Sequence, residues 1–487
     1  MVNFKELESQ YIDGEWRDGS SQLKMENRNP YNDDLIASSH AASKAGVDEA
    51  YKAAASAQRD WAKSNIMKKR EVMENAVVYI EENYDDIASI IMEELGATKL
   101  KADFEIGLVI NMLKESSTYP ARMVGSIHPS AIDEYKENRV YRNPIGVVGV
   151  LSPFNFPFFL SVKSVAPALA TGNGVVLKPH EDTTITGGTM IAKIFEEAGL
   201  PKGLFNVIST EISEIGDSVV DHPIPQSISF TGSTPVGKHI GQVAGGNLKE
   251  THLELGGNNA FIVLDDADID LAVSAAVFSR FTHQGQICMS SNRLVLHEAI
   301  YDEFVEKFKN KVMELKCGDP QDSETIIGPL INKRQVENTQ KLVDKAIEEG
   351  ANPIVQRGVE GNVFKPVVFT DVKPEMSYLQ EEFFAPVVSI LKVSSDEEAV
   401  EVANKSPYGL SGALHTSDVE RGTELAKQVY TGMIHINDGS IDDDPTVAFG
   451  GVKNSGIGRL NGKWSLDAFT TTQWISVQHK PRQYPYS

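Results

Sequence analysis

The stretch SISFTGSTPVGKHI, from Ser227 to Ile240, contains a short β-prone run, a glycine turn and the start of a helix. Pro235 suits the first turn of a helix, where its missing N–H leaves no bond unmade. Glycines at such a turn let the backbone approach a ligand, and the free N–H groups at the helix start attract phosphate. The spacing is not the G-x-G-x-x-G dinucleotide fingerprint. An ordinary strand-to-helix turn therefore remains an alternative to a phosphate site.

Strands and helices alternate on both sides of this turn. The apolar runs VVGVL, GVVLKP, LFNVIS and HLELGG are separated by helical text, which includes Phe159–Thr171 and Thr183–Ala198. A second series runs from NAFIVL (259–264) to MIHIN (433–437). This alternation predicts βαβ units around parallel sheets. Because 487 residues exceed what one core accommodates, we expect two α/β domains with a boundary near Gly256 and Gly257.

Three other segments follow different patterns. Residues 43–121 have apolar positions at i, i+3, i+4 and i+7, which predicts helices, with Gly96 as a helix stop. Residues 125–143 form two β-prone pieces around a polar turn, which predicts a projecting hairpin. The segment Thr470–Gln478 alternates like an edge strand that could pair with another subunit.

The composition excludes several classes of protein. A net charge of -22 argues against nucleic acid or an anionic membrane surface as partner. The most apolar stretch, GVVGVLSPFNFPFFLSV (146–162), is interrupted by Pro, Ser and Asn, so we expect no membrane span. The N-terminus has no apolar run of signal-peptide length, which makes the cytoplasm the expected location. Cys288 and Cys317 lack CxxC or histidine partners at metal-ligand spacing, so we expect neither a disulfide nor a metal.

Three residues have the chemistry of a reactive site. Cys288 lies in THQGQICMSS (282–291), where most neighbours are polar or small. A thiol with an ordinary pKa of about 8.5 needs a base or a positive field to react. Glu254 ends an apolar strand before two glycines, and Asn155, between two prolines, could donate to an oxyanion. His283 allows a Cys–His dyad, but nothing in the sequence places a third group to orient it. For Glu254 and Asn155 structural roles remain open.

Lys178 and Glu181, in VVLKPHED, follow the end of a predicted strand. A carboxylate at this place can hold both hydroxyls of a ribose. A solvated loop is the alternative.

Seven motifs occur in an order that resembles one known family. They are PFNFP, KPHE, FTGSTPVG, LELGG, GQICMS, EEFFAPV and FGGVKNSGIGR. Over essentially its whole length the chain resembles the NAD(P)-dependent aldehyde dehydrogenases, with most similarity to the benzaldehyde, vanillin and salicylaldehyde dehydrogenase branch. The resemblance implies a Rossmann-type NAD-binding domain (1–122 and 144–255), an α/β catalytic domain (256–456) and oligomerisation elements (123–143 and 470–487). It also implies a homodimer or homotetramer.

The resemblance assigns a role to each matched residue. Cys288 would be the nucleophile, Glu254 the general base and Asn155 the oxyanion donor. Lys178 and Glu181 would grip the adenosine ribose of NAD, with Ser233 near the pyrophosphate. Glu382 would hold the nicotinamide ribose and Phe384 would pack on the nicotinamide ring. The full set of cofactor-binding residues would be Leu151, Ser152, Phe154, Lys178, Glu181, Gly232, Ser233, Gly237, Leu255, Gly256, Glu382 and Phe384.

The implied reaction oxidises an aldehyde to the acid through a cysteine thiohemiacetal and a thioester. If the roles carry over, an apolar channel would be lined by Phe156, Phe159, Ile287 and Met289. Such a channel suits an aromatic ring, although an aliphatic aldehyde or a semialdehyde would fit nearly as well.

Glu181 favours NAD, because its carboxylate would repel the 2′-phosphate of NADP. Lys178 and His180 could soften that repulsion and allow some use of NADP.

The chain departs from many relatives at three places. Ala448 replaces a proline, Leu460 replaces a second carboxylate, and Lys163-Ser164 replaces a Trp–Lys pair. The last two departures put alternative proton relays in doubt and give more weight to Glu254.

Three rival functions are less consistent with the motifs. A cofactor-independent cysteine hydrolase would leave Lys178, Glu181 and Glu382 without a purpose. CoA-acylating relatives usually lack a base at the position of Glu254. A non-catalytic homologue would be expected to have lost the thiol or the base.

Overall fold

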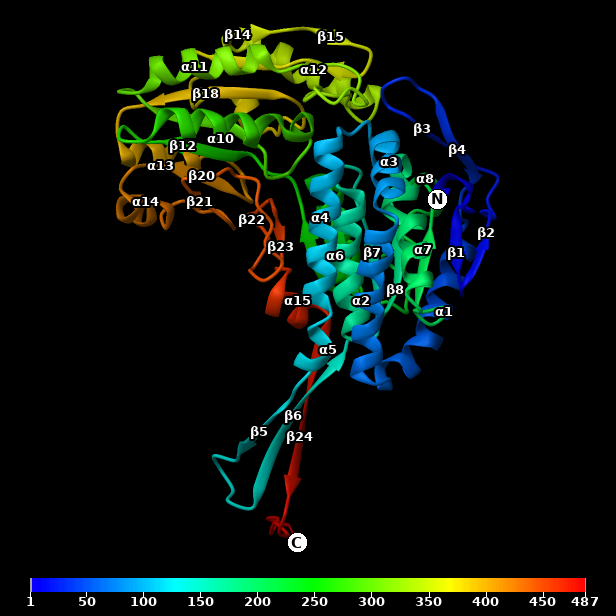
Figure 1. Ribbon diagram of the computed structural model, residues 1–487. Helices are drawn as coiled ribbons and strands as arrows, with labels where there is room; N and C mark the ends of the chain where they lie inside the picture. Colours follow the sequence, from blue (N-terminus) through cyan, green and yellow to red (C-terminus); the bar gives the residue numbers. More distant parts are fainter. Residues whose placement is uncertain (1, 487) are drawn as a thin grey trace.

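The computed structural model describes residues 2–486 and contains two large sheets, each with helices on both faces (Figure 1). The first sheet has eight strands. Their order is β2 (Glu15–Arg17), β1 (Gln10–Ile12), β9 (Phe205–Ile208), β8 (Gly174–Lys178), β7 (Val147–Leu151), β10 (Ser227–Thr231), β11 (Glu250–Glu254) and β23 (Gly456–Ile457). The five strands from β9 to β11 are parallel. The remaining pairs in this sheet are antiparallel.

Both faces of the first sheet are buried. Val148 and Val150 of β7 belong to one hydrophobic cluster, whereas Val147 and Leu151 belong to another. This is why VVGVL is apolar throughout instead of alternating. Side chains of α1 (Lys44–Lys63) and α9 (Thr234–Gly246) contribute to one cluster. Those of α2 (Ile66–Glu82), α4 (Lys99–Ser116), α6 (Pro157–Ala170) and α7 (Met190–Glu197) contribute to the other.

The strand order reverses beside β7. From β7 the chain proceeds to β8 and β9 on one side, and then returns to β10 on the other side. The connections after β7 and β10 therefore leave the sheet in opposite directions. In open α/β sheets ligands bind in the crevice that such a reversal leaves at the carboxyl ends of the strands.

The second sheet has seven strands in the order β14 (Asn352–Gln356), β17 (Val367–Thr370), β18 (Val387–Val393), β13 (Ser291–His297), β12 (Asn259–Val263), β20 (Gly412–His415) and β21 (His435–Ile436). All neighbours are parallel except β14 and β17. Its helices are α10 (Ile269–Phe281), α11 (Tyr301–Glu314), α12 (Lys333–Glu348), α13 (Asp396–Asn404) and α14 (Val419–Ala426). The two parallel sheets confirm the predicted α/β fold class.

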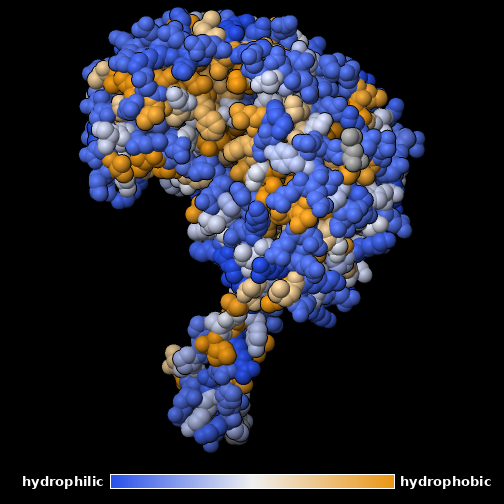
Figure 2. Space-filling view, in the orientation of Figure 1, coloured by the Kyte–Doolittle hydropathy of each residue, from blue (hydrophilic) through white to orange (hydrophobic). Residues whose placement is uncertain are grey.

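A third sheet, called here the projecting sheet, extends away from the body (Figure 1). It consists of β5 (Ser126–Pro129), β6 (Lys136–Pro144) and β24 (Thr470–Gln478). The predicted hairpin and tail strand are both confirmed as elements. β24 pairs with β6 of its own chain along its full length. Hydrophobic side chains are interspersed among hydrophilic ones on this sheet (Figure 2).

Helices form where the periodicity predicts them in residues 43–121. α1 and α2 are followed by α3 (Tyr84–Leu95), α4 and α5 (Tyr119–Arg122). Gly96 ends α3 with a φ of 60°, a left-handed conformation that glycine adopts without strain. The predicted helix stop is therefore confirmed.

One predicted helix begins differently from expectation. Residues 183–198 contain a 3₁₀ turn (Glu181–Thr183) and a π-helical segment (Ile185–Thr189) before α7. The backbone N–H groups of Ile185 and Thr186 donate to the buried Glu94 carboxylate, at 2.9 and 2.7 Å. Because these donors have a partner on another helix, the first turns need not follow the regular α pattern.

The remaining elements are small. They are β3 (Lys24–Arg28) with β4 (Leu35–His40), β15 (Val359–Glu360) with β16 (Val363–Phe364), β19 (Tyr408–Gly409) with β22 (Val452–Lys453), and the helices α8 (Ile212–Ile215) and α15 (Gly462–Ala468). Within residues 2–486 no helix combines the length and the apolar character that crossing a membrane requires.

Candidate active site

Cys288 lies on a loop between α10 and β13 whose backbone is held by the side chain of Asn259. The Asn259 side-chain amide donates to the carbonyl oxygens of Cys288 and Ser290, at 2.8 and 2.9 Å. A side chain at position 257 would collide with the Cys288 carbonyl oxygen, so only glycine permits this approach. Cys288 itself is partly buried. The loop therefore holds the thiol in a defined position.

The backbone just before the thiol is strained. His283, Gln284 and Gly285 have φ angles of 49°, 55° and 72°. A left-handed conformation costs a non-glycine residue roughly 1–2 kcal/mol. The buried Arg280 guanidinium holds this segment, because it donates to the carbonyl oxygens of Gly285 and Phe383, at 2.7 and 3.2 Å. Such strain, when surrounding bonds maintain it, is typical of functional loops.

Glu254 is the last residue of β11 and is 5% exposed. Its Oε2 atom has no hydrogen-bond partner among the described residues. Burial raises the pKa of Glu254 to about 8, and the positive charges of Lys163 and Arg459 limit this rise. A buried carboxyl group with a pKa near neutrality has the properties of a general base.

The Cys288 thiol is protonated in this environment. Burial raises its pKa to about 12, and the carboxylates of Glu382 and Glu254 add to the effect. Lys163 acts in the opposite direction. A reacting thiol must therefore lose its proton before it attacks, either to solvent or to a buried base.

Asn155 and His283 have different surroundings. Asn155 lies at the wall of a cavity that Cys288 also lines, and its amide nitrogen donates one hydrogen to the carbonyl oxygen of Gln286, at 2.9 Å. An amide nitrogen carries two hydrogens, so a second donor remains. His283 packs edge-on against Phe156, with ring centroids 5.6 Å apart. No hydrogen bond between His283 and Cys288 is present in residues 2–486, so the geometry does not support the dyad.

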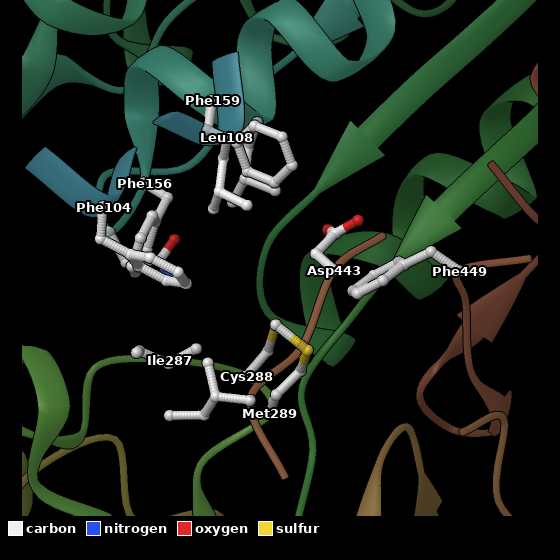
Figure 3. A pocket seen from close by; sticks show the side chains of 12 residues that line it. Phe104, Leu108, Phe156, Phe159, Ile287, Cys288, Met289, Asp443 and Phe449 are labelled. Atoms are coloured by element: carbon white, nitrogen blue, oxygen red, sulfur yellow. The ribbon is translucent and has the colours of Figure 1, made fainter. Parts of the chain in front are cut away.

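The cavity beside Cys288 is almost entirely apolar (Figure 3). Phe156, Phe159, Ile287 and Met289 line it, which confirms the predicted channel walls. The sequence interpretation missed other members that come from α4, from α6 and from the loop after β21: Phe104, Leu108, Leu160, Ile441, Asp443 and Phe449. Only Phe449 was in a recognised motif. The others have no local signal, because they reach the cavity only through packing of distant elements.

The residues predicted to hold the adenosine half of the cofactor meet at the strand reversal. Lys178 ends β8 opposite Leu151 of β7, and its ammonium lies 3.5 Å from the Glu181 carboxylate. Burial alone would raise the pKa of Glu181, but His180 and Lys178 lower it below the usual range. Glu181 is therefore an ionised carboxylate at the carboxyl edge of the sheet, which can accept both hydroxyls of a ribose.

Ser152 lies in the turn after β7, Gly232 and Ser233 lie in the turn after β10, and Gly237 lies in the first turn of α9. The Ser152 N–H donates to the Lys178 carbonyl oxygen, at 3.1 Å. Ser233 precedes α9 as its N-cap, but its hydroxyl does not cap the helix. A side chain at Gly237 would collide with that of Leu255, which places these two segments in contact. The first N–H groups of a helix of 13 residues thus stand at the crevice, as anion binding requires.

The residues predicted to hold the nicotinamide half meet at the crossing between the two large sheets. Glu382 accepts the Gly257 N–H, at 3.0 Å, and a side chain at Gly256 would collide with its carboxylate. Burial raises the pKa of Glu382 to about 7. Phe384 packs edge-on against Phe154, with centroids 5.8 Å apart. The structure thus brings most of the sequence-predicted residues to one of two clusters or to the wall of the Cys288 cavity, whereas Glu254 is buried at the end of β11 and is not among the residues that line that cavity.

Comparison with known proteins agrees with this arrangement. The model of the aldehyde dehydrogenase family matches residues 16–475. The chain is 60% identical to a benzaldehyde dehydrogenase of Bacillus subtilis, and the match covers 100% of both chains. It is 47% identical to a vanillin dehydrogenase of Corynebacterium glutamicum, over 96% of this chain and 97% of the relative.

A solved structure is also similar. The crystal structure of an NAD-dependent benzaldehyde dehydrogenase from Corynebacterium glutamicum superposes with a TM-score of 0.90 at 44% identity, and the match covers 98% of this chain and 99% of that one. The match along nearly the whole chain, together with a thiol and an amide at one cavity and a buried carboxyl group whose charge acts on that thiol, leads to one conclusion. The chain belongs to the aldehyde dehydrogenase family.

Proposed function

We propose that this protein oxidises aromatic aldehydes, such as benzaldehyde or vanillin, to carboxylic acids with NAD. The observation that carries the proposal is that Cys288 opens onto a cavity whose walls include four phenylalanines, namely Phe104, Phe156, Phe159 and Phe449. Flat apolar rings pack favourably against such walls. The relatives named for benzaldehyde and vanillin support the same substrate class.

Three side chains, those of Cys288, Asn155 and Glu254, have separate roles in the reaction. The Cys288 thiol gives its proton to solvent, and its sulfur adds to the carbonyl carbon. The resulting oxyanion is stabilised by the second N–H of Asn155 and a backbone N–H of the loop. NAD, when bound, would supply the acceptor for the hydride, and a thioester would then remain on Cys288. Glu254 takes a proton from the water that attacks the thioester, the C–S bond breaks, and the carboxylic acid and the thiolate are released.

The residues at the strand reversal fit NAD. The Glu181 carboxylate would accept the ribose hydroxyls, the α9 N–H groups with Ser233 would bind the pyrophosphate, and Glu382 would accept the second ribose. The Glu181 charge disfavours a 2′-phosphate at the same place. We therefore expect a higher kcat/KM with NAD than with NADP, with some activity retained with NADP.

The proposal also covers the domains of the chain, its assembly and its location. Residues 1–122 and 144–255 would form the NAD-binding domain and residues 256–456 the catalytic domain. Residues 123–143 and 470–487 would join the chains of a homodimer or homotetramer. The cytoplasm is the proposed location.

The test measures NADH formation with benzaldehyde, vanillin and hexanal in parallel, with Cys288→Ala as the control. Fastest turnover with an aromatic aldehyde, lost in the variant, is the expected result. Turnover of hexanal alone would overturn the aromatic assignment and keep the mechanism. If the folded protein formed no NADH but hydrolysed an activated ester without NAD, the hydrolase alternative would replace the proposal.

A further inference from the structure

A buried ion pair reaches the substrate cavity through one of its members, Asp443, which lines the cavity wall. Lys163 on α6 and Asp443 on the loop after β21 have side chains that are each 2% exposed, and the ammonium lies 2.5 Å from a carboxylate oxygen. The Asn461 amide donates to the other carboxylate oxygen, at 2.7 Å. Apart from Cys288, Asp443 is the only ionisable residue among those that line the cavity (Figure 3).

The surroundings of the pair are apolar. The Lys163 ammonium lies 3.2 Å from the centroid of the Phe449 ring and 5.4 Å from that of Phe159. Transfer of two charges out of water costs several kcal/mol per ion, and apolar residues of similar volume often replace a buried pair without loss of stability. Packing alone therefore does not explain a lysine and an aspartate at these positions.

The pair lies beside both reacting groups. Phe449, under the Lys163 ammonium, is followed by Gly450, where a side chain would come within 3.0 Å of the Glu254 carboxylate. Asp443 lines the cavity that contains the Cys288 sulfur. The negative charge of Asp443 thus borders the cavity of the nucleophile, and the positive charge of Lys163 lies over the ring of Phe449, whose neighbour in the chain approaches the base.

We propose that Lys163 is a positioning residue whose charge, held in place by Asp443, favours the ionised forms of Glu254 and Cys288. The proposal rests on the roles proposed above for those two residues. It assigns electrostatic support for the base to a lysine of α6, in the segment where Lys163-Ser164 replaces the Trp–Lys pair of many relatives.

Other charged groups act on the same two residues. Burial is the largest influence and raises the pKa of both Glu254 and Cys288. Lys163 lowers the pKa of both, whereas Asp443 raises the pKa of both. Arg459 lowers the pKa of Glu254. Among these groups Lys163 is the only cation that acts on Cys288.

Because Lys163 and Asp443 carry opposite charges, removing one or the other should shift the ionisation of Cys288 in opposite directions. A purely structural ion pair would not produce this pattern. The experiment measures the pH dependence of Cys288 alkylation by iodoacetamide in a Cys317→Ser background, without cofactor or aldehyde. Lys163→Met is expected to raise the pH midpoint by roughly one unit, the usual effect of a nearby charge. Asp443→Asn is expected to lower the midpoint, and Lys163→Arg to preserve it. The acidic limb of kcat/KM should move in the same directions.

The double variant Lys163→Met/Asp443→Leu isolates the lysine charge even if Lys163→Met does not fold. It leaves no unpaired ion, and its midpoint should lie above that of Asp443→Asn. Equal midpoints in these two variants, or shifts of both single variants in the same direction, would overturn the proposal. Because alkylation requires no turnover, the result is independent of whether the protein oxidises aromatic aldehydes.

Discussion

At the scale of single residues, Asn155 offers the most direct test of the oxyanion site. Asn155→Ala should lower kcat for benzaldehyde by about 10²–10³, because one donor to the developing charge is lost. Steady-state NADH formation measures this effect. The dissociation constant for NAD, measured by calorimetry, should stay unchanged. A loss of only a few-fold would assign Asn155 a structural role in the turn.

The role proposed for Glu254 predicts that its replacement affects the two halves of the reaction, NADH formation and thioester hydrolysis, differently. As the pH rises through its pKa of about 8, the carboxyl group ionises, so the thioester hydrolysis step should accelerate. Glu254→Gln should lower the steady-state rate by about 10²–10⁴ and remove this pH dependence, because the amide cannot accept the proton from water. Stopped-flow absorbance should still show one rapid turnover of NADH per site. Loss of that first turnover as well would mean that Glu254 acts mainly on the thiol.

At the scale of elements, a buried ion pair within α4 also makes a hydrogen bond to α6. Lys101 and Glu105 of α4 form a salt bridge with both side chains at most 1% exposed, and Glu105 also accepts the Phe159 N–H of α6, at 3.1 Å. Lys101→Met should reduce the free energy of unfolding by about 3–5 kcal/mol, because it leaves a buried carboxylate unpaired.

The matched control for this prediction is Lys101→Met/Glu105→Gln, which removes both charges and keeps an acceptor for the Phe159 N–H. Its loss of stability in chemical denaturation should be clearly smaller than that of the single variant. Equal losses would show that packing of the lysine stem, and not charge, dominates.

At the scale of the whole molecule, the projecting sheet is the proposed site of assembly. Ile127 of β5 and Ile475 of β24 both pair in register with Arg139 of β6, and they are 68% and 43% exposed. Ile127→Lys/Ile475→Lys should convert the oligomer to smaller species in sedimentation velocity, because charges would enter the proposed interface. Ile66→Lys, on the exposed surface of α2, is the control. An unchanged sedimentation coefficient in the double variant would place the interface elsewhere.

The five parallel strands of the first large sheet, the hairpin and the tail strand could be predicted because each has a local signature. Apolar runs between turns, a polar turn between β-prone segments and strict alternation all depend on residues that are neighbours in the chain. The glycine at position 96 is a similar case, since a left-handed helix end is a local requirement. The π-helical segment at Ile185–Thr189 could not be predicted, because its cause, the Glu94 carboxylate, is 91 residues away along the chain.

By itself the sequence determined the family and the α/β fold class, and it supplied the thiol, base and amide that we propose for the site, because each lies in a short motif whose residues are contiguous. Only the tertiary structure decided that Phe104 and Leu108 face the same cavity as Cys288, and that Lys163 meets Asp443 across 280 positions of the chain. Such contacts form when elements distant in the chain pack around one core. Their energies depend on burial and charge in three dimensions, and no local pattern of residues records them.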